Sequence, residues 1–121
     1  SIMSKKLAEG IDGLVLDVKF GSGAFMKTAE KAEELATSLM SIARGYKKEV
    51  SALITSMNQP LGRYAGNSLE VQECVDIMSG KSAVGFSGKD LYADTRELSL
   101  LLSAEMLFLA QREKTFEQCL K

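Results

Sequence analysis

The sequence contains no histidine and only two cysteines, and both shortages limit the chemistry it can carry out. Histidine is the commonest general base and metal ligand, so Ser/His or Cys/His nucleophilic catalysis cannot be assembled from these 121 residues alone. Cys74 and Cys119 are too few and too far apart for a disulfide framework, and they lack the paired spacing of a zinc site. We predict that both are reduced, buried thiols.

Neither sign of charge dominates, because 15 basic residues oppose 16 acidic ones and leave a formal net charge of −1. This balance provides no overall field to attract nucleic acid or an anionic membrane, so any anion site must be local. No apolar run with a cleavage site follows the N-terminal lysines, and the apolar stretch 98–109 is shorter than the ~20 residues that span a bilayer. We therefore expect a cytoplasmic protein whose partners include neither nucleic acid nor a membrane.

Length and apolar pattern predict a single α/β unit. At 121 residues, 45% of them hydrophobic, the chain can fill one core. We expect helices over about 1–9, 28–44, 67–80, 94–111 and 115–121, and strands over about 14–18 and 50–55. A strand, a helix and a second strand in this order imply parallel strands joined by a right-handed crossover helix that covers the sheet.

Local signals add detail to these elements. Caps are expected at three helix starts: at Thr28, at Asn67 with Glu70, and at Thr115 with Gln118. The strand over 14–18 is mostly branched and apolar, which suits burial on both faces. Segment 81–89 is rich in Gly, Ser and Lys and is expected to be a surface loop. The helix over 94–111 is apolar nearly all round at its centre, which favours a buried core helix or an interface helix.

The N-terminal region combines a cationic helix end with a glycine-broken turn, an arrangement that suits a polar ligand. Ser1 and Lys5 are four residues apart, so on a helix a hydroxyl and an ammonium can converge on one small molecule; a solvated helix face is the alternative. Lys19 and Ser22 flank glycines just after a strand, where backbone N–H groups often bind anions. For Gly21-Ser-Gly23 we favour a structural turn over phosphate contact.

Three blocks of sequence carry a resemblance to a known family. They are SIMSKK at 1–6, DVKFGSGAFM at 17–26, and MNQPLG continuing to AGNSLEV over 57–71. In order and spacing they resemble the middle of pyrimidine-nucleoside phosphorylases and thymidine phosphorylases, pentosyltransferases that split a nucleoside with phosphate into a free base and a pentose 1-phosphate. The resemblance covers the first two-thirds of the chain closely and is looser from Lys81 onward.

The resemblance implies a central fragment of a larger two-domain enzyme. Residues 1–10 would end a helix of the helical domain, and residues 11–121 would form a single compact part of the α/β domain, truncated at both ends. The glycine-rich phosphate-binding loop and an arginine that helps hold the base would lie upstream. We therefore expect no turnover from this polypeptide alone.

The resemblance also implies roles for residues that are present. Ser1 and Lys5 match positions that hydrogen-bond the pyrimidine ring, Ile2 lies against the ring, and Phe25 matches a residue beside the 5-position of the base. Lys5 would be catalytic, because negative charge gathers on the departing pyrimidine and a cation beside the ring stabilises the transition state. To reach the same base as Phe25, Lys5 would lie near Phe25 and the glycine turn. On sequence alone, an aromatic such as Phe25 is otherwise expected in the core.

A monovalent cation, usually potassium, is implied at a second site. Its ligands would be the backbone carbonyls of Leu61 and Tyr64 and the carboxylate of Glu73, and oxygen ligands of this kind suit a large, weakly charged hard ion. The alternative is that Glu73 lies on an exposed helix face. Phosphate is expected as co-substrate, with no organic cofactor, and the full-length protein is expected to be a homodimer.

Two other classes stay open. A phosphoribosyltransferase of related fold, such as anthranilate phosphoribosyltransferase, would need magnesium and a phosphoribosyl pyrophosphate site. A non-catalytic α/β remnant would only fold or associate. An acidic, metal-binding segment upstream would favour the transferase, whereas a serine- and glycine-rich loop containing a lysine would favour phosphorolysis.

Overall fold

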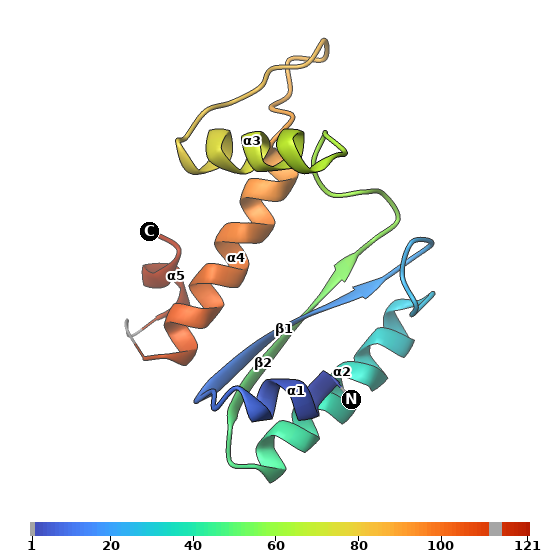
Figure 1. Ribbon diagram of the computed structural model, residues 1–121, viewed down its shortest axis with the longest axis vertical. Helices are drawn as coiled ribbons and strands as arrows, with labels where there is room; N and C mark the ends of the chain where they lie inside the picture. Colours follow the sequence, from blue (N-terminus) through green and yellow to red (C-terminus); the bar gives the residue numbers. More distant parts are fainter. Residues whose placement is uncertain (1, 112–114) are drawn as a thin grey trace. The chain divides into compact units, whose positions relative to one another are not determined.

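The computed structural model describes residues 2–111 and 115–121 and has an α/β fold (Figure 1). The elements in chain order are α1 (Ile2–Ala8), β1 (Gly13–Phe20), α2 (Ala29–Gly45), β2 (Glu49–Ser56), α3 (Asn67–Met78), α4 (Ala93–Leu109) and α5 (Phe116–Cys119). Strands β1 and β2 are parallel and are connected through α2. The predicted fold class and the parallel pair with its crossover helix are confirmed.

The chain divides into two compact units. The first contains the residues up to Gln59 together with those from Leu101 onward, and the second is Pro60–Leu100. This grouping differs from the single unit expected over 11–121. The assignment of segments to the domains of a larger enzyme stays a prediction.

In the first unit, α2 covers one face of the β1–β2 pair. The strands run in register from Gly13 opposite Glu49 to Phe20 opposite Ser56, so each extends beyond its predicted range. Val18 of β1 is buried against Ala32 and Ala36 of α2. Small alanine side chains let the helix backbone approach the sheet closely, and this apolar contact forms one part of the core.

Helix α1 extends the same core. Met3 is buried in a cluster with Ala43 of α2 and Val50 of β2, and Leu7 packs against that cluster from one helical turn further along α1. The i, i+4 spacing of Met3 and Leu7 places both on one side of α1. Helix α1 is therefore held to the first unit by one apolar face.

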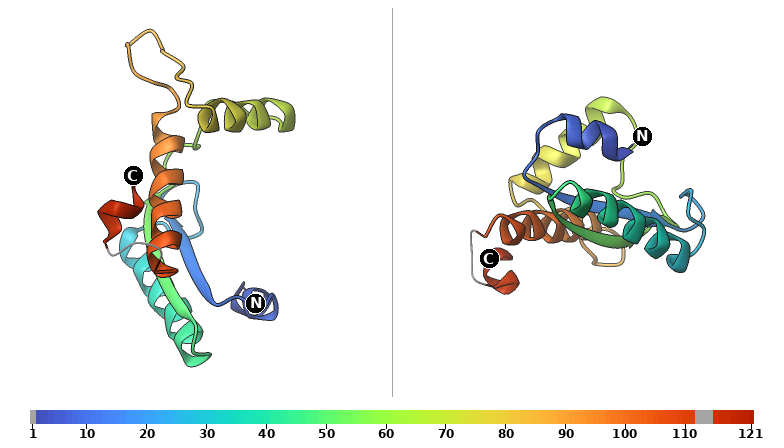
Figure 2. Two further views of the ribbon diagram at one scale, coloured as in Figure 1. Left: turned by 90° about the vertical axis from the view of Figure 1, so that its left-hand side faces the viewer. Right: turned by 90° about the horizontal axis from the view of Figure 1, so that it is seen from below.

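The opposite face of the strand pair is partly polar and Asp17 on it is exposed, which corrects the expectation that the strand over 14–18 is buried on both faces. Asp17 and Lys19 point to this face from β1, and Lys19 donates a hydrogen bond to Thr55 of β2. The second half of α4 also lies on this side of the strands (Figure 2), where Glu105 accepts a hydrogen bond from Ser51. Polar pairing on this face is what allows charged residues inside β1.

Two of the three predicted helix caps are confirmed. Thr28 Oγ1 accepts a hydrogen bond from the Lys31 N–H at the start of α2, and Thr115 with Gln118 forms a complete capping box at α5. The predicted cap at Asn67 is wrong, because Gly66 precedes α3 and makes no side-chain cap. The Glu70 carboxylate accepts the Gly66 N–H at 2.9 Å, so only the acidic half of the expected box is present.

In the second unit, the loop that follows α3 is exposed over most of 81–89, as predicted, and it is closed by Asp90. Asp90 Oδ1 accepts the N–H groups of Ala83 and Tyr92, both at 3.1 Å, and Oδ2 pairs with Arg96. The Arg96 guanidinium, followed by the Tyr92 N–H, lowers the pKa of Asp90 to about 2. Asp90 therefore joins the end of this loop to the first turn of α4.

Two predictions about burial are wrong, one for Cys74 and one for the helix over 94–111. Cys119 is buried as predicted, but Cys74 is exposed, since the neighbouring Glu73 takes the inward-facing position of α3. In α4, Ala104 is buried whereas Leu100, Met106, Leu107 and Phe108 are exposed, so the core-helix prediction is wrong and the interface alternative stays a prediction. No helix within the described ranges combines the length and apolar character needed for a membrane span.

Candidate functional site

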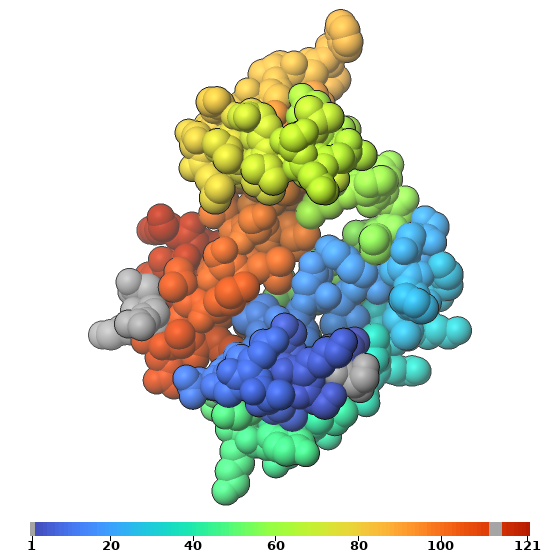
Figure 3. Space-filling view, viewed as in Figure 1, coloured from blue at the N-terminus to red at the C-terminus, as the bar shows by residue number. Residues whose placement is uncertain are grey.

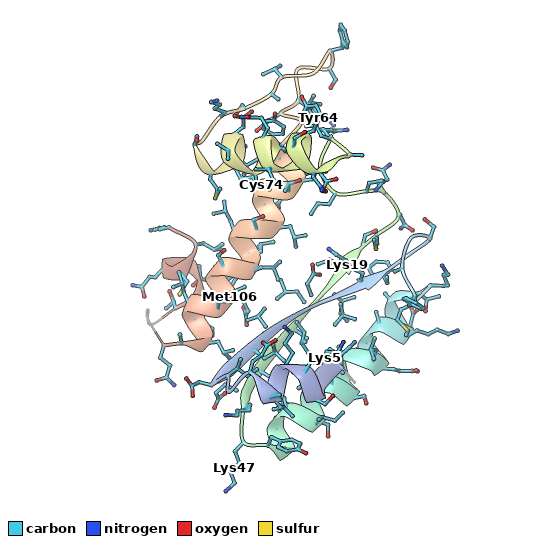
Figure 4. The ribbon with its side chains drawn as sticks, viewed as in Figure 1. Lys5, Lys19, Lys47, Tyr64, Cys74 and Met106 are labelled. Carbon is cyan, nitrogen blue, oxygen red and sulfur yellow. The ribbon has the colours of Figure 1, made fainter. Side chains whose placement is uncertain are left out.

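Helix α1 exposes Ile2 and Lys5, and Figure 4 labels Lys5 on this helix. Successive helical residues are turned by about 100°, so Lys5 lies on the far side of the helix axis from the buried Met3. Ile2, which is 55% exposed, is three residues from Lys5 and adjacent to it on the helix surface. Within the described residues the ammonium group of Lys5 has no hydrogen-bond or ion-pair partner. The structure thus brings two predicted substrate contacts, Ile2 and Lys5, onto one open face.

The turn after β1 closes through its own backbone and the end of β2. All four consecutive N–H groups of the turn donate to acceptors of the protein: Gly21 to the Met26 carbonyl at 2.9 Å, Ser22 to Asn58 Oδ1 at 3.0 Å, Gly23 to the Met57 carbonyl at 3.0 Å, and Ala24 to the Gly21 carbonyl at 3.1 Å. None of these N–H groups is left to bind an anion. This pattern agrees with the structural turn that the sequence favours over phosphate contact.

Both glycines of the turn are required by close approach. A Cβ atom on Gly21, whose φ is +119°, would lie 2.5 Å from Asn58 Oδ1. A Cβ atom on Gly23 would lie 2.8 Å from the Met57 carbonyl oxygen. Neither position accepts a larger side chain without displacing the segment that follows β2.

Phe25 projects from this turn and is 100% exposed. Its side chain therefore packs against nothing in the described chain, and the expectation that it belongs to the core is wrong. In Figure 3, α1 and the light-blue turn both reach the surface on the face shown. No contact joins Lys5 to Phe25 among the described residues, and Ser1 lies outside them, so the roles of these three residues stay predictions.

Lys19 is engaged within the sheet and is not free for a ligand (Figure 4). Its Nζ lies 2.9 Å from Asp17 Oδ2 and donates to Thr55 Oγ1 at 2.9 Å. These bonds hold the charge of Lys19 over the carboxyl ends of both strands. The sequence gives no direct signal for this network, because Thr55 is 36 residues away from Lys19 along the chain.

The second unit contains the residues of the predicted cation site. Glu73 of α3 is buried, with 5% of its surface exposed, so the alternative that it lies on an exposed helix face is wrong. Its carboxylate accepts the Arg63 N–H at 3.1 and 3.2 Å and the Tyr64 N–H at 3.3 Å. Leu61 and Tyr64 are about half exposed in the same loop. The structure therefore joins Tyr64 directly to Glu73.

Further contacts hold the loop around Glu73. Arg63 Nε donates to the Leu91 carbonyl at 3.1 Å. Tyr92 is buried, and this burial, together with the neighbouring Tyr64, raises the pKa of the Tyr92 phenol. Sequence reasoning identified Glu73 and Tyr64 but gave no signal for Leu91 or Tyr92, which come from a loop far along the chain.

The oxygen atoms in and around this loop are of the chemical type that binds a monovalent cation. A carboxylate offers about four lone-pair sites, so the two N–H groups that Glu73 accepts leave capacity for an ion. Backbone carbonyls from Leu61 and Tyr64 would supply further oxygen ligands of the kind that large hard cations prefer. The described residues contain no cluster of three or more Asp, Glu, Cys or His that could hold a metal ion. Potassium at this loop stays a prediction.

Comparison with known proteins gives the class to which this fold and these residues belong. The family model described as "Glycosyl transferase family, a/b domain" matches residues 1–121, the entire chain. The chain belongs to this family. The match extends over the region from Lys81 onward, where the resemblance read from the sequence is looser.

The similar proteins that carry a name point to a narrower class than the family does. The chain is 48% identical over 118 residues to a protein named pyrimidine-nucleoside phosphorylase from Staphylococcus aureus (strain USA300), covering 98% of this chain and 25% of the relative. It is 47% identical over 118 residues to the pyrimidine-nucleoside phosphorylase of Staphylococcus haemolyticus (strain JCSC1435), with the same coverage. The chain thus spans about a quarter of the length of these relatives.

Proposed function

We propose that this chain is part of a pyrimidine-nucleoside phosphorylase, which uses phosphate to convert thymidine or uridine into the free base and a (deoxy)ribose 1-phosphate. The observation that carries the proposal is the 48% identity over 98% of the chain to a relative of that name. The open face of α1 supports the proposal, because Lys5 and Ile2 lie side by side there. Among the described residues the Lys5 ammonium has no hydrogen-bond or ion-pair partner. In cellular terms this is a cytoplasmic pentosyltransferase of pyrimidine salvage.

Lys5 is the proposed catalytic residue. As the glycosidic bond lengthens, negative charge gathers on the pyrimidine while the pentose becomes cationic, and phosphate attacks the pentose carbon. A fixed ammonium beside the ring oxygens stabilises the departing base more in the transition state than in the ground state. Ser1 donates a hydrogen bond to the same ring, Ile2 lies against it, and Phe25 lies beside its 5-position.

A lysine-to-methionine pair of variants tests this role in the full-length enzyme. Lys5→Met keeps a long side chain but removes the charge, and we expect kcat to fall by about 10²–10³-fold, the usual effect of removing a transition-state donor. Lys6→Met is the matched control, since Lys6 pairs with Glu9 at 3.4 Å on the helix surface. Equal kcat values for both variants and the unmodified enzyme would refute the role of Lys5.

A potassium ion bound by Leu61, Tyr64 and Glu73 is proposed to hold the loop before α3, and the full-length enzyme is proposed to be a homodimer. Phosphate is the co-substrate, and no organic cofactor is needed. Phosphorolysis measured in sodium, potassium and lithium salts tests the ion. Activity that depends on potassium in the unmodified enzyme but not in Glu73→Gln supports the site, whereas identical salt dependence of the two proteins argues against it.

A further inference from the structure

Asn58 is a polar residue for which the proposed function gives no role. It lies two residues after the end of β2 at Ser56, and its side chain makes two hydrogen bonds with different neighbours. Asn58 Oδ1 accepts the Ser22 N–H at 3.0 Å, and Nδ2 donates to Ser56 Oγ at 3.1 Å. The Asn58 carbonyl also accepts from Ser22 Oγ at 3.4 Å. One side chain thus joins the end of β2 to the turn that follows β1.

The fit between Asn58 and the turn is close on both sides. The Cβ position of Gly21 lies 2.5 Å from Asn58 Oδ1, so glycine is the residue that leaves room for this contact. On the other side of the turn, Lys27 Nζ donates to the carbonyls of Ser22 at 3.0 Å and Ala24 at 2.8 Å. The backbone on either side of Phe25 is therefore tied to the first unit.

A turn held by this many hydrogen bonds, yet carrying a fully exposed aromatic side chain, needs an explanation other than core packing. The ring of Phe25 contributes nothing to the core, since it is 100% exposed. Fixing a contact residue before its ligand arrives reduces the ordering cost of binding. The many bonds to the turn fit this purpose, because they order the backbone that presents the ring.

We propose that Asn58 is a positioning residue that holds the 21–26 turn so that Phe25 meets the pyrimidine base of the nucleoside. The inference rests on the proposed function. Asn58 does not itself touch the base, and it acts through the Ser22 N–H and hence through the placement of Phe25. Loss of this hydrogen bond weakens binding of the base in ground and transition states alike, which raises KM and leaves kcat nearly unchanged.

Steady-state kinetics of the full-length enzyme separate this role from a general structural one. Asn58→Ala is expected to raise KM for thymidine or uridine about tenfold, equivalent to about 1.4 kcal/mol, with kcat and KM for phosphate within twofold of normal. Asn58→Asp keeps an acceptor oxygen for the Ser22 N–H and is expected to restore KM. Gln59→Ala, at the exposed neighbouring position, is the matched control. An unchanged nucleoside KM in Asn58→Ala would overturn the proposal.

A double-mutant cycle that combines Asn58→Ala with Phe25→Ala separates the positioning role of Asn58 from the base contact proposed for Phe25. If Asn58 acts through Phe25, adding Asn58→Ala to Phe25→Ala causes no further rise in KM, whereas additive effects overturn the positioning role. If Phe25→Ala alone leaves the nucleoside KM normal, the proposed function of Phe25 is what fails, and the positioning role fails with it.

Amide hydrogen exchange in the 121-residue chain provides a readout that needs no enzyme activity. The Ser22 N–H is expected to exchange at least tenfold faster in Asn58→Ala than in the unmodified chain or in Asn58→Asp. Exchange at Lys31, whose N–H is bonded to Thr28, serves as an internal reference and should stay constant. Unchanged Ser22 exchange in Asn58→Ala would refute the hydrogen bond on which the proposal depends.

Discussion

Gly21 illustrates how one position can be fixed by two independent constraints. Its φ of +119° is strained for any residue with a side chain, and a Cβ atom there would lie 2.5 Å from Asn58 Oδ1. Gly21→Ala is therefore expected to lower the free energy of unfolding by about 2–3 kcal/mol. Urea denaturation followed by circular dichroism measures the change.

The control for this substitution is Gly45→Ala, at the end of α2. A Cβ atom on Gly45 meets nothing within 4 Å, and alanine has the higher helix propensity. Gly45→Ala should leave stability unchanged or raise it by up to about 1 kcal/mol. Equal losses in Gly21→Ala and Gly45→Ala would show that the close approach to Asn58 is absent in solution.

Glu73 gives a second prediction at a single position. Removing its carboxylate in Glu73→Ala leaves the Arg63 and Tyr64 N–H groups without their acceptor, at an expected cost of about 1–3 kcal/mol. Glu73→Gln keeps one acceptor oxygen and should cost less. Glu97→Ala, on an exposed site of α4, is the control and should change stability by less than about 0.5 kcal/mol. A Glu73→Ala variant as stable as Glu97→Ala would contradict the buried network.

Among the elements, the loop before α4 should respond to acid through Asp90. Its pKa is lowered from 3.8 to about 2 in the folded chain, chiefly by Arg96, so the folded state favours the charged form. The resulting stabilisation is fully present above pH 4 and is lost as the pH falls through about 2. Thermal unfolding between pH 2 and pH 5 should show this loss, and Asp90→Asn should reduce it.

Asp12→Asn is the control for the acid response, because Asp12 is exposed and makes no hydrogen bond through its side chain among the described residues. Its unfolding midpoint should follow that of the unmodified chain across the same pH range. If Asp90→Asn follows it too, Asp90 is not the group that links acid to stability.

Elements could be predicted from the sequence where their signals are local, and less well where partners lie far apart. The parallel pair and the Thr28 cap follow from apolar spacing and from a hydroxyl beside a helix start. The full length of β1 could not be predicted, because Asp17 and Lys19 interrupt its apolar run and their pairing with Thr55 appears only once β2 lies beside β1. Glycines at 21 and 23 signalled a tight turn but not Asn58 as its partner.

The chain as a whole spans about a quarter of the length of the relatives it matches, and this leads to a prediction about activity. The purified 121-residue chain is expected to release no base from thymidine or uridine, because it spans only about a quarter of the length of these relatives and we propose that the rest of the active site lies in the remaining length. Base release is measured by chromatography, with the Staphylococcus aureus enzyme as positive control. Phosphorolysis by the isolated chain would contradict the proposal that it carries only part of the active site.

Binding of a free pyrimidine base by the full-length protein distinguishes a nucleoside phosphorylase from a non-catalytic remnant. Isothermal titration of the full-length protein with uracil or thymine should produce heat, and the heat should decrease in Lys5→Met but not in Lys6→Met. A full-length protein that binds neither base would indicate the remnant instead.

We propose that phosphate attacks the pentose while Lys5 stabilises the departing pyrimidine. The most direct test is product analysis of the full-length protein incubated with thymidine or uridine, with and without phosphate. We predict that base is released only when phosphate is present, in amounts equal to the pentose 1-phosphate formed. Base release without phosphate, or activity only with phosphoribosyl pyrophosphate and magnesium, would contradict phosphorolysis as the reaction.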